Sequence, residues 1–316
     1  MSFMLILCSA ISCAAASLHI ADYDGSFVGD PDVFIIGAQK GGTTSLSGFL
    51  MHRVKYFVES FKRKEPHFFD SHFDDQSFND YIKGFIEERD RHGNSSHYYS
   101  SLDSSPAYFR TPKVWQRMKK LYSPECLKQK KFILSLREPI SRDFSWFSHM
   151  YGECKKYNIA FCPSKGGRDF HDTFHDYVKR THQGGAQSGD GFYLKNLKSF
   201  LDFIPRSQLF IINFESLVDE SQQQDIIKRM LRFLGIPFPD AQDTSFPHSN
   251  SREVHCGSRC DDEDLHEIRC SDIGFLNETY SKANYGLIEF INSDPNRPES
   301  EPLFLTFEET IQLQCI

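Results

Sequence analysis

Short apolar runs alternate with longer amphipathic stretches along most of this chain. The runs at 33–36, 98–102, 131–136 and 209–213 are largely apolar or aromatic, as buried strands are. Helical periodicity predicts helices over 43–52, 77–89, 111–122, 140–151, 192–203, 220–234 and 273–291. This alternation predicts an α/β protein, with one central parallel sheet flanked by helices on both faces.

Chain length and local composition predict three regions. The 316 residues suffice for one large α/β domain, which we expect over 31–292, followed by a C-terminal tail over 293–316. The stretch after Tyr151 is expected to be a loop insertion. Residues 1–16 are apolar and end in small residues, which predicts a signal peptide or short leader, too short to span a bilayer comfortably.

Net charge and glycosylation motifs restrict the function classes and the cellular location expected for this protein. The formal net charge of −7 argues against general nucleic-acid binding, which usually requires a basic excess. Asn94 and Asn277 stand in N-x-[ST] motifs, which fit a secretory route to the Golgi lumen or beyond. No later segment is long and apolar enough to span a membrane, so we expect membrane association at most through the leader.

The stretch "GAQKGGTTSL", residues 37–46, follows the first apolar run and predicts a phosphate-binding loop. Glycines allow close backbone approach, and the start of the next helix attracts anions. A triphosphate loop reads G-x-x-x-x-G-K-[ST], but here Thr43 follows the last glycine and the lysine is Lys40. Lys40 is therefore expected at the mouth of the loop, beside a 5′-phosphate and its substituent. The residues expected to cradle that phosphate are Gly41, Gly42, Thr43, Thr44 and Ser45.

A second phosphate contact is predicted after the strand at 131–136. Arg137 lies at the carboxyl end of that strand, on the edge shared with the first loop, and Ser145 lies in the following helix. Arginine and serine suit a phosphate clamp because the guanidinium fork binds two oxygens. Taken alone, a salt bridge between Arg137 and Glu138 would be the default. Together the two motifs indicate a ligand with two separated phosphates.

These motifs resemble those of the sulfotransferase family. "FIIGAQKGGTTSL" is similar to its 5′-phosphosulfate loop and "FILSLREPISRDFSWF" to its 3′-phosphate loop. The resemblance extends over about 31–240 through "KEPHFFD", "SSPAYF", "GFYLKNLKSFLDFIP" and "LFIINFESL", and is strongest to heparan sulfate N- and 3-O-sulfotransferase domains. It implies a P-loop-like three-layer fold.

The resemblance also implies a donor and the roles of several residues. The donor would be 3′-phosphoadenosine 5′-phosphosulfate (PAPS), with no metal required. Lys40 would stabilise the charge that grows on the bridging oxygen of the leaving phosphate. Glu65, in "KEPHFFD", would be the general base, and a nearby Lys40 would keep it ionised. If this segment is extended, the side chain of His67 would point to the same side as that of Glu65. His67 is therefore a candidate for orienting the acceptor.

Ordinary structural roles compete with these assignments. Glu65 could be a surface carboxylate paired with Arg63 or Lys64, and His67 could be purely structural. Related glycan enzymes often carry a lysine two residues before the proline of "PAYF", where this chain has Ser104. Arg110 is one basic residue that could replace it, along with Lys62 and Arg63.

The cysteine-rich stretch "HCGSRCDDEDLHEIRC", residues 255–270, allows two interpretations. Its cysteines and histidines could bind zinc, or Cys256 could form a disulfide with Cys270 or with Cys260, which an oxidising lumen favours. The resemblance implies a disulfide-closed loop over the donor, and Cys270 is the slightly better partner for Cys256. Arg259 within this loop is a candidate phosphate contact.

The combined prediction is a PAPS-dependent sulfotransferase that acts on a hydroxyl or amine of a glycan or glycosaminoglycan-like acceptor. One alternative is a nucleotide-dependent phosphoryl-transfer enzyme, which would require magnesium and a lysine directly before Thr43 or Thr44. The other is a catalytically silent glycan-binding relative, which the substitution at Ser104 favours.

Overall fold

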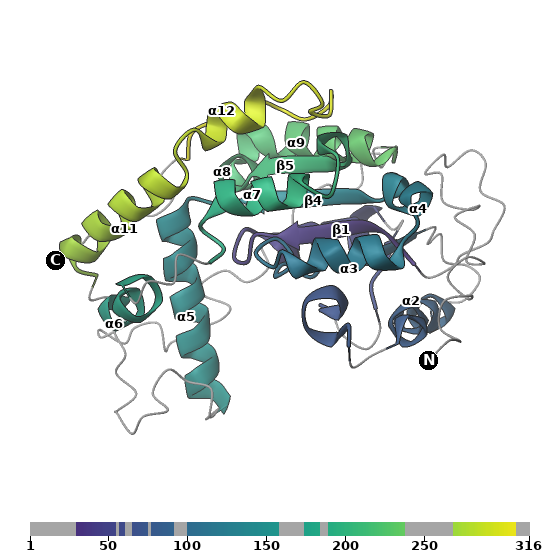
Figure 1. Ribbon diagram of the computed structural model, residues 1–316, viewed down its shortest axis with the longest axis horizontal. Coiled ribbons are helices and arrows are strands. Elements are labelled where there is room, and N and C mark those ends of the chain that lie inside the picture. The colour runs from purple at the N-terminus through teal and green to yellow at the C-terminus, as the bar shows by residue number, and fades with distance from the viewer. Residues whose placement is uncertain are drawn as a thin grey trace.

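The centre of the protein is a five-stranded parallel sheet (Figure 1). The computed structural model describes residues 30–54, 57–60, 65–74, 77–91, 100–157, 174–183, 189–237 and 268–307. The strand order is β2-β3-β1-β4-β5 and every neighbouring pair is parallel. The strands are β1 (Pro31–Gly37), β2 (Phe57–Val58), β3 (Ser100–Asp103), β4 (Lys131–Leu136) and β5 (Leu209–Asn213).

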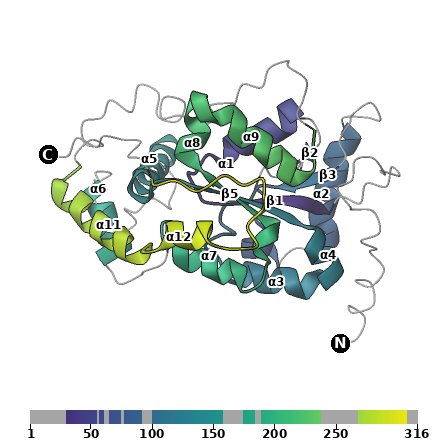
Figure 2. The ribbon, with the colours of Figure 1, turned by 90° about the horizontal axis from the view of Figure 1, so that it is seen from above.

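Alternate residues of the strands pack into two separate cores, one on each face of the sheet. Val33 and Ile35 of β1 pack with α1 (Thr43–Phe49) and α9 (Glu220–Leu234). Phe34 and Ile36 pack on the opposite side with α3 (Lys113–Leu121), α7 (Tyr193–Leu201) and α12 (Leu287–Asn292). Figure 2 shows these two helical layers on either side of the strands. The predicted three-layer α/β fold is confirmed.

The four predicted strands all form, and a fifth was missed. β4 and β5 have the predicted bounds, whereas β2 contains only Phe57 and Val58. Two residues carry too little periodicity to predict a strand. Parallel pairing of β2 with β3 defines it instead.

Several predicted helix boundaries were wrong. The helix predicted to end at residue 151 continues as α5 (Pro139–Tyr157), so the insertion begins later. The single helix predicted over 273–291 is two, α11 (Cys270–Ala283) and α12, because Gly286 adopts a left-handed φ of 76° between them. The run after the first loop is α1 followed by a π-helical turn, Leu50–Val54.

The remaining elements are short or peripheral. They are α2 (Phe78–Arg91), α4 (Pro124–Gln129), α6 (Phe174–Val178) and α8 (Phe214–Val218), with π-helical turns at Phe68–His72 and Lys179–Gln183 and a 3-10 turn at Arg206–Gln208. The short helix α4 went unpredicted, although Ser123 caps it and Pro124 occupies its first position. In the described part of the chain, no helix is long and apolar enough to cross a membrane.

The segment after α12 is integrated into the domain. Phe304 is buried in the core that contains α3 and α7. Its backbone exchanges two hydrogen bonds with the Asn292 side chain, at 2.8 and 2.9 Å. Residues 294–307 therefore cover one face of the fold, while the predicted boundary at residue 293 stays a prediction.

Candidate functional site

The glycine-rich loop lies at the carboxyl end of β1, between the ends of β3 and β4. Open α/β sheets bind ligands at this edge. The Ala38 N–H donates to the Ser135 carbonyl at 2.8 Å, and the Gly41 N–H donates to the Ala38 carbonyl at 2.9 Å. These bonds close a tight turn against β4, and helix α1 begins directly after it.

Neighbouring atoms leave no room for side chains at the two central glycines of this loop. A Cβ at Gly41 would lie 2.5 Å from the Ser135 carbonyl oxygen. A Cβ at Gly42 would lie 2.9 Å from the Phe214 ring, and Gly42 has a φ of 78°. Both positions therefore require glycine, for packing in one case and for packing and backbone conformation in the other.

The predicted phosphate-cradling residues lie together on this loop. Lys40 adopts a φ of 69°, an uncommon value for a residue with a side chain. Thr43 and Ser45 are buried, and Thr44 is partly buried in the first turn of α1. Backbone geometry thus fixes Lys40 at the position where the chain leaves the strand and turns into the helix.

Arg137 extends from the end of β4 toward the same loop. Its Nη1 donates to the Lys40 carbonyl at 3.3 Å, and its guanidinium carbon lies 4.9 Å from the centre of the Phe214 ring. The Tyr193 hydroxyl donates to the Arg137 carbonyl at 2.6 Å. Burial lowers the pKa of Arg137. Arg137 therefore contacts the backbone of Lys40, at the edge of the sheet where the sequence places both residues.

Glu138 caps the following helix. Its carboxylate accepts hydrogen bonds from the backbone N–H groups of Ile140 at 2.9 Å and Ser141 at 2.6 Å. Helix α5 then carries Ser145, which is partly exposed. Arg259, the other predicted phosphate contact, lies outside the described residues.

Glu65 and His67 lie in the segment after β2, on the same edge of the sheet. His67 Nε2 lies 3.2 Å from Glu65 Oε2, and its Nδ1 lies 3.1 Å from Asp70 Oδ2. Asp70 and then Glu65 raise the pKa of His67 to about 10 through these hydrogen bonds. His67 is therefore an imidazolium at neutral pH, and it cannot accept another proton. Arg63 and Lys64, the partners of Glu65 in the alternative structural interpretation, lie outside the described residues.

A buried network fixes the backbone of this segment. Asp103, at the end of β3, is fully buried and accepts hydrogen bonds from the hydroxyls of Ser105, Tyr81 and Tyr108 at 2.6–2.8 Å. Ser105 in turn accepts from the His67 N–H at 3.0 Å. This network connects "SSPAYF" to "KEPHFFD", which were separate motifs in the sequence.

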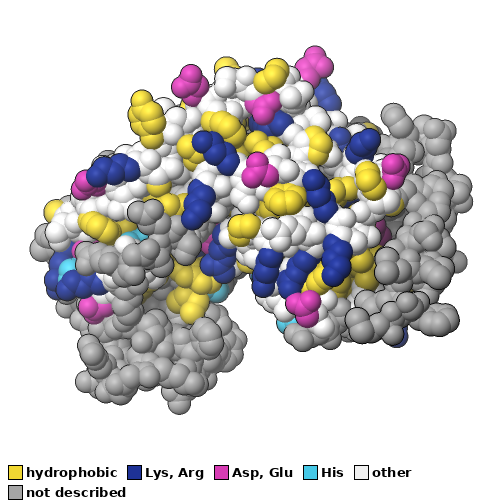
Figure 3. Space-filling model, in the orientation of Figure 1, with side chains coloured by type: hydrophobic (Ala, Val, Ile, Leu, Met, Phe, Trp, Pro, Cys, Tyr) yellow, Lys and Arg dark blue, Asp and Glu magenta, His cyan; other side chains and the backbone are white. Residues whose placement is uncertain are grey.

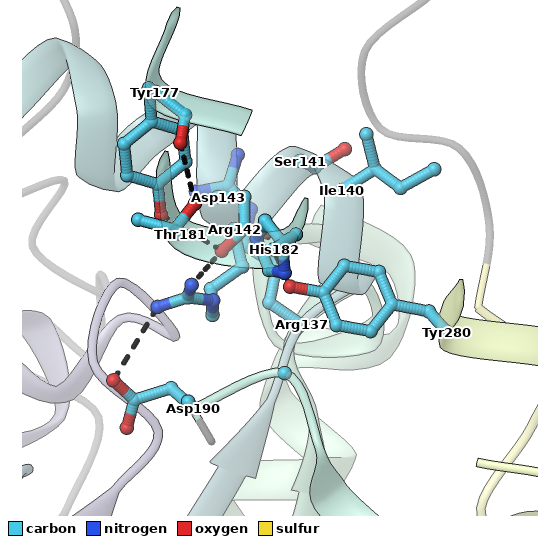
Figure 4. Close-up of polar contacts among 12 residues, drawn as sticks. Arg137, Ile140, Ser141, Arg142, Asp143, Tyr177, Thr181, His182, Asp190 and Tyr280 are labelled. Atoms are coloured by element: carbon cyan, nitrogen blue, oxygen red, sulfur yellow. Dashed lines mark hydrogen bonds and ion pairs between the residues drawn. The ribbon is translucent and has the colours of Figure 1, made fainter. Parts of the chain in front are cut away.

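A second buried polar network, which the sequence did not predict, lies behind the loop (Figure 4). Arg142 of α5 pairs with Asp143 and, at 3.5 Å, with Asp190. Arg110 also pairs with Asp190, at 3.6 Å, and the backbone of Gln39 donates a hydrogen bond to the same carboxylate. Asp190 therefore connects helix α5 to the residue that precedes Lys40.

Asp143 gathers donors from three other segments. His182 Nε2 lies 2.9 Å from its carboxylate, the Tyr177 hydroxyl donates at 3.4 Å, and the Tyr280 hydroxyl also donates. Burial, and then the positive charge of Arg142, lower the pKa of His182 to about 4. His182 is thus neutral at pH 7 and donates its Nε2 proton to Asp143. Asp143 lies within "FILSLREPISRDFSWF", but nothing in that motif indicates its partners, and His182 lies in no motif.

Glu215 lies at the end of β5. It is buried, and its Oε1 accepts from the Glu138 N–H at 2.9 Å. Burial raises the pKa of Glu215 to about 7. Polar residues that follow all five strands therefore lie at one edge of the sheet. Among them, Glu215 holds the backbone of Glu138, next to Arg137.

The cysteine and metal predictions remain largely outside the described residues. Cys126 and Cys270 each take part in a disulfide bond. Residues 255–266 lie outside the description, so the pairing of Cys270 and the zinc alternative stay predictions. Among the residues that the structure describes, no cluster of His, Cys, Asp and Glu could hold a metal ion.

Comparison with known proteins identifies a family for this chain. The sulfotransferase domain family matches residues 30–263. Heparan sulfate glucosamine 3-O-sulfotransferase 3A1 of Mus musculus is 28% identical over 206 residues, covering 65% of this chain and 46% of that protein. Heparan sulfate glucosamine 3-O-sulfotransferase 5 of Mus musculus is 27% identical over 208 residues, covering 66% of this chain and 54% of that protein. The chain thus spans about half the length of these curated relatives.

A solved structure supports the fold. The sulfotransferase from Alicyclobacillus acidocaldarius superposes with a TM-score of 0.57 at 19% identity, covering 84% of this chain and 97% of that one. The family match covers most of this chain and includes the glycine-rich loop, Glu65 and Arg137. The chain therefore belongs to the sulfotransferase domain family.

Proposed function

We propose that this chain transfers a sulfuryl group from PAPS to a hydroxyl or amine of a glycosaminoglycan-like glycan. The observation that carries the proposal is the meeting of Arg137 and Lys40 at the carboxyl edge of the sheet, 3.3 Å apart from guanidinium nitrogen to backbone carbonyl. Two cations at the ends of neighbouring strands suit a donor that has a 5′-phosphosulfate and a separate 3′-phosphate.

The described residues fit the two phosphates of such a donor. Gly41 and Gly42 allow the loop backbone to approach a phosphate closely, and Thr43 to Ser45 continue the cradle. Arg137 Nε is buried without a hydrogen-bond partner, so a bound phosphate could satisfy it. Ser145 of α5 is the second contact proposed for the 3′-phosphate, and Arg259 a third.

Lys40 is proposed to stabilise the leaving group. Attack by the acceptor oxygen or nitrogen forms a new bond to sulfur while the bond from sulfur to the bridging oxygen breaks. The electron pair of that bond passes to the 5′-phosphate, which departs as adenosine 3′,5′-bisphosphate. A lysine at the loop mouth favours this charge more in the transition state than in the bound donor.

Glu65 is proposed as the general base, with His67 as its positioning residue. The acceptor loses a proton during attack, and Glu65 is a carboxylate on the correct edge of the sheet to take it. Since His67 is already protonated at neutral pH, it cannot compete for that proton. Its imidazolium instead holds Glu65 Oε2 at 3.2 Å and is itself fixed by Asp70.

The relatives and the surface of the protein support an anionic glycan as the acceptor. The named relatives act on glucosamine of heparan sulfate. Figure 3 shows Lys and Arg side chains gathered over α3, where Lys113, Lys119 and Lys120 are exposed. We further propose a secretory location, which the predicted leader supports. Asn277, one of the two predicted glycosylation sites, is exposed on α11.

Ligand-induced thermal stabilisation and labelled-sulfate transfer test this function together. Adenosine 3′,5′-bisphosphate should raise the melting temperature, whereas ATP with magnesium should not. The wild-type chain should transfer sulfate from PAPS to at least one of a panel of desulfated polysaccharides. Stabilisation by ATP with magnesium alone would favour phosphoryl transfer, and bisphosphate binding without transfer would favour a silent glycan-binding relative.

The variant Glu65→Gln tests the proposed base. It should reduce kcat by about 10²- to 10⁴-fold with little change in bisphosphate affinity, since a general base acts mainly in the transition state. Glu125→Gln, which changes an exposed carboxylate on α4, provides the control. An equal loss of bisphosphate affinity in Glu65→Gln would contradict this role, whereas Lys40→Ala should weaken both binding and turnover.

A further inference from the structure

Arg110 lies beside the glycine-rich loop because the segment before it packs on the end of β1. The Phe109 N–H donates to the Ile36 carbonyl at 2.9 Å. A Cβ at Gly37 would lie 2.8 Å from the Phe109 Cβ. This close packing fixes the backbone at position 110 where β1 leads into the loop.

The side chain of Arg110 is directed by a buried carboxylate. Its Nη1 lies 3.6 Å from Oδ2 of Asp190, whose side chain is 2% exposed. Asp190 also accepts a hydrogen bond from the backbone of Gln39. The Arg110 guanidinium is therefore held near the residue that precedes Lys40, on the edge where the strands end.

This anchoring leaves hydrogen-bonding capacity on the Arg110 guanidinium. The distance of 3.6 Å is an ion-pair contact, longer than a hydrogen bond. Within the described ranges, Asp190 is the one residue that forms an ion pair with Arg110, while Asp190 is itself shared with Arg142. The Arg110 side chain is 40% exposed, and a guanidinium has five N–H donors in a planar fork.

Ser104 carries no charge at the carboxyl edge of the sheet. It is 2% exposed and lies directly after β3, on the segment that also carries Arg110. A reaction between an anionic donor and an anionic acceptor requires cations around the transferred group. Arg110 is an exposed cation of this segment, close to the loop that carries Lys40.

We propose that Arg110, anchored by Asp190, binds an oxyanion at the reaction centre. This inference rests on the function proposed above. The oxyanion belongs either to the sulfuryl group of the donor or to a sulfate or carboxylate of the acceptor glycan. Arg110 would then supply the positive charge that Ser104 does not.

Equilibrium binding to Arg110→Gln and Arg110→Lys tests the inference without relying on turnover. Arg110→Gln removes the charge, whereas Arg110→Lys keeps it but loses the fork. Lys83→Gln is the matched control because Lys83 is an exposed cation on α2 with its own acidic partner, Glu87, at 3.6 Å. The three probes are PAPS, adenosine 3′,5′-bisphosphate and a heparin-derived hexasaccharide.

The probes distinguish the two sources of the oxyanion. If Arg110 contacts the sulfuryl group, Arg110→Gln should weaken PAPS binding about tenfold and leave the bisphosphate, which lacks that group, unchanged. If Arg110 contacts the acceptor, the hexasaccharide should bind about tenfold more weakly and PAPS should be unaffected. Arg110→Lys should show a smaller loss in either case.

Two further results separate this inference from the proposed function. Wild-type affinities for all three probes in Arg110→Gln, matching those of Lys83→Gln, would overturn the role of Arg110 even if the wild-type chain transfers sulfate. Failure of the wild-type chain to bind PAPS and the bisphosphate would overturn the proposed function. A tenfold loss of hexasaccharide binding in Arg110→Gln would still support an oxyanion site at Arg110 in that case.

Discussion

His67 is held as a cation by carboxylates at both of its ring nitrogens. Because its pKa rises from 6.5 to about 10, the folded state retains a proton that the unfolded chain loses. The stabilisation is therefore complete below pH 6.5 and is lost as the pH rises through about 10. We predict that the difference in unfolding free energy between the wild-type chain and His67→Gln shrinks over that range, as measured by urea unfolding.

A spectroscopic measurement checks the same residue directly. The ring resonances of His67 should show no titration between pH 6 and 8, and Asp70→Asn should bring the transition to lower pH, since Asp70 makes the largest contribution to the shift. Titration of wild-type His67 near 6.5 would contradict the imidazolium assignment and its positioning role.

The buried carboxylate of Asp143 joins helix α5 to α6, the following π-helical turn and α11. Neutral His182 donates to it, and protonation of that imidazole is opposed by burial and by Arg142, which lower its pKa from 6.5 to about 4. Since the unfolded chain binds the proton more readily, stability should fall as the pH drops through 6.5 toward 4. Melting temperatures of the wild-type chain and of the His182→Phe variant, measured from pH 7 to pH 5, test this prediction.

The comparison should isolate His182 from the other histidines. His182→Phe should lose much of the acid-induced decrease, while His52→Gln, at an exposed position, should retain it. His67 does not interfere, because its own window lies above 6.5. Equal pH slopes in all three proteins would show that His182 does not couple this packing to pH.

At the scale of the whole molecule, a buried ion pair joins the C-terminal segment, residues 294–307, to the turn just before β5. Glu301 is 1% exposed, its carboxylate pairs with both terminal nitrogens of Arg206, and it accepts from the Ile211 N–H at 2.8 Å. Glu301→Gln should lower the free energy of unfolding by about 3 kcal/mol, because it leaves the buried Arg206 uncompensated. Denaturant unfolding measures the loss.

The neighbouring exposed residue Glu299 provides the control for this effect. Glu299→Gln should change stability by less than about 0.5 kcal/mol, as surface substitutions usually do. A similar small change in Glu301→Gln would mean that the C-terminal segment contributes little to the stability of the domain.

Local patterns were sufficient for the elements that carry strong periodicity or special residues. β4, β5 and α9 have the predicted bounds because apolar alternation and caps such as Asp219 and Gly235 are encoded locally. The loop could be recognised from the sequence because its glycines follow an apolar run directly. The structure shows why Gly41 and Gly42 are glycines, since nearby atoms leave no room for a side chain. β2 was missed because its pairing with β3, rather than its own periodicity, defines it, whereas the break at Gly286 follows from the left-handed backbone of that glycine, a local signal that the helical periodicity masked.

The sequence by itself determined the layered α/β fold, the loop with Lys40, and Arg137 at the neighbouring strand end, since each rests on residues close together in the chain. Only the tertiary structure decided which distant groups meet there. The backbone of His67 is held by Ser105, 38 residues away in the chain, and the anchoring of Arg110 depends on Asp190, 80 residues away. Such contacts arise from parallel strands ending at one edge, which no local pattern records.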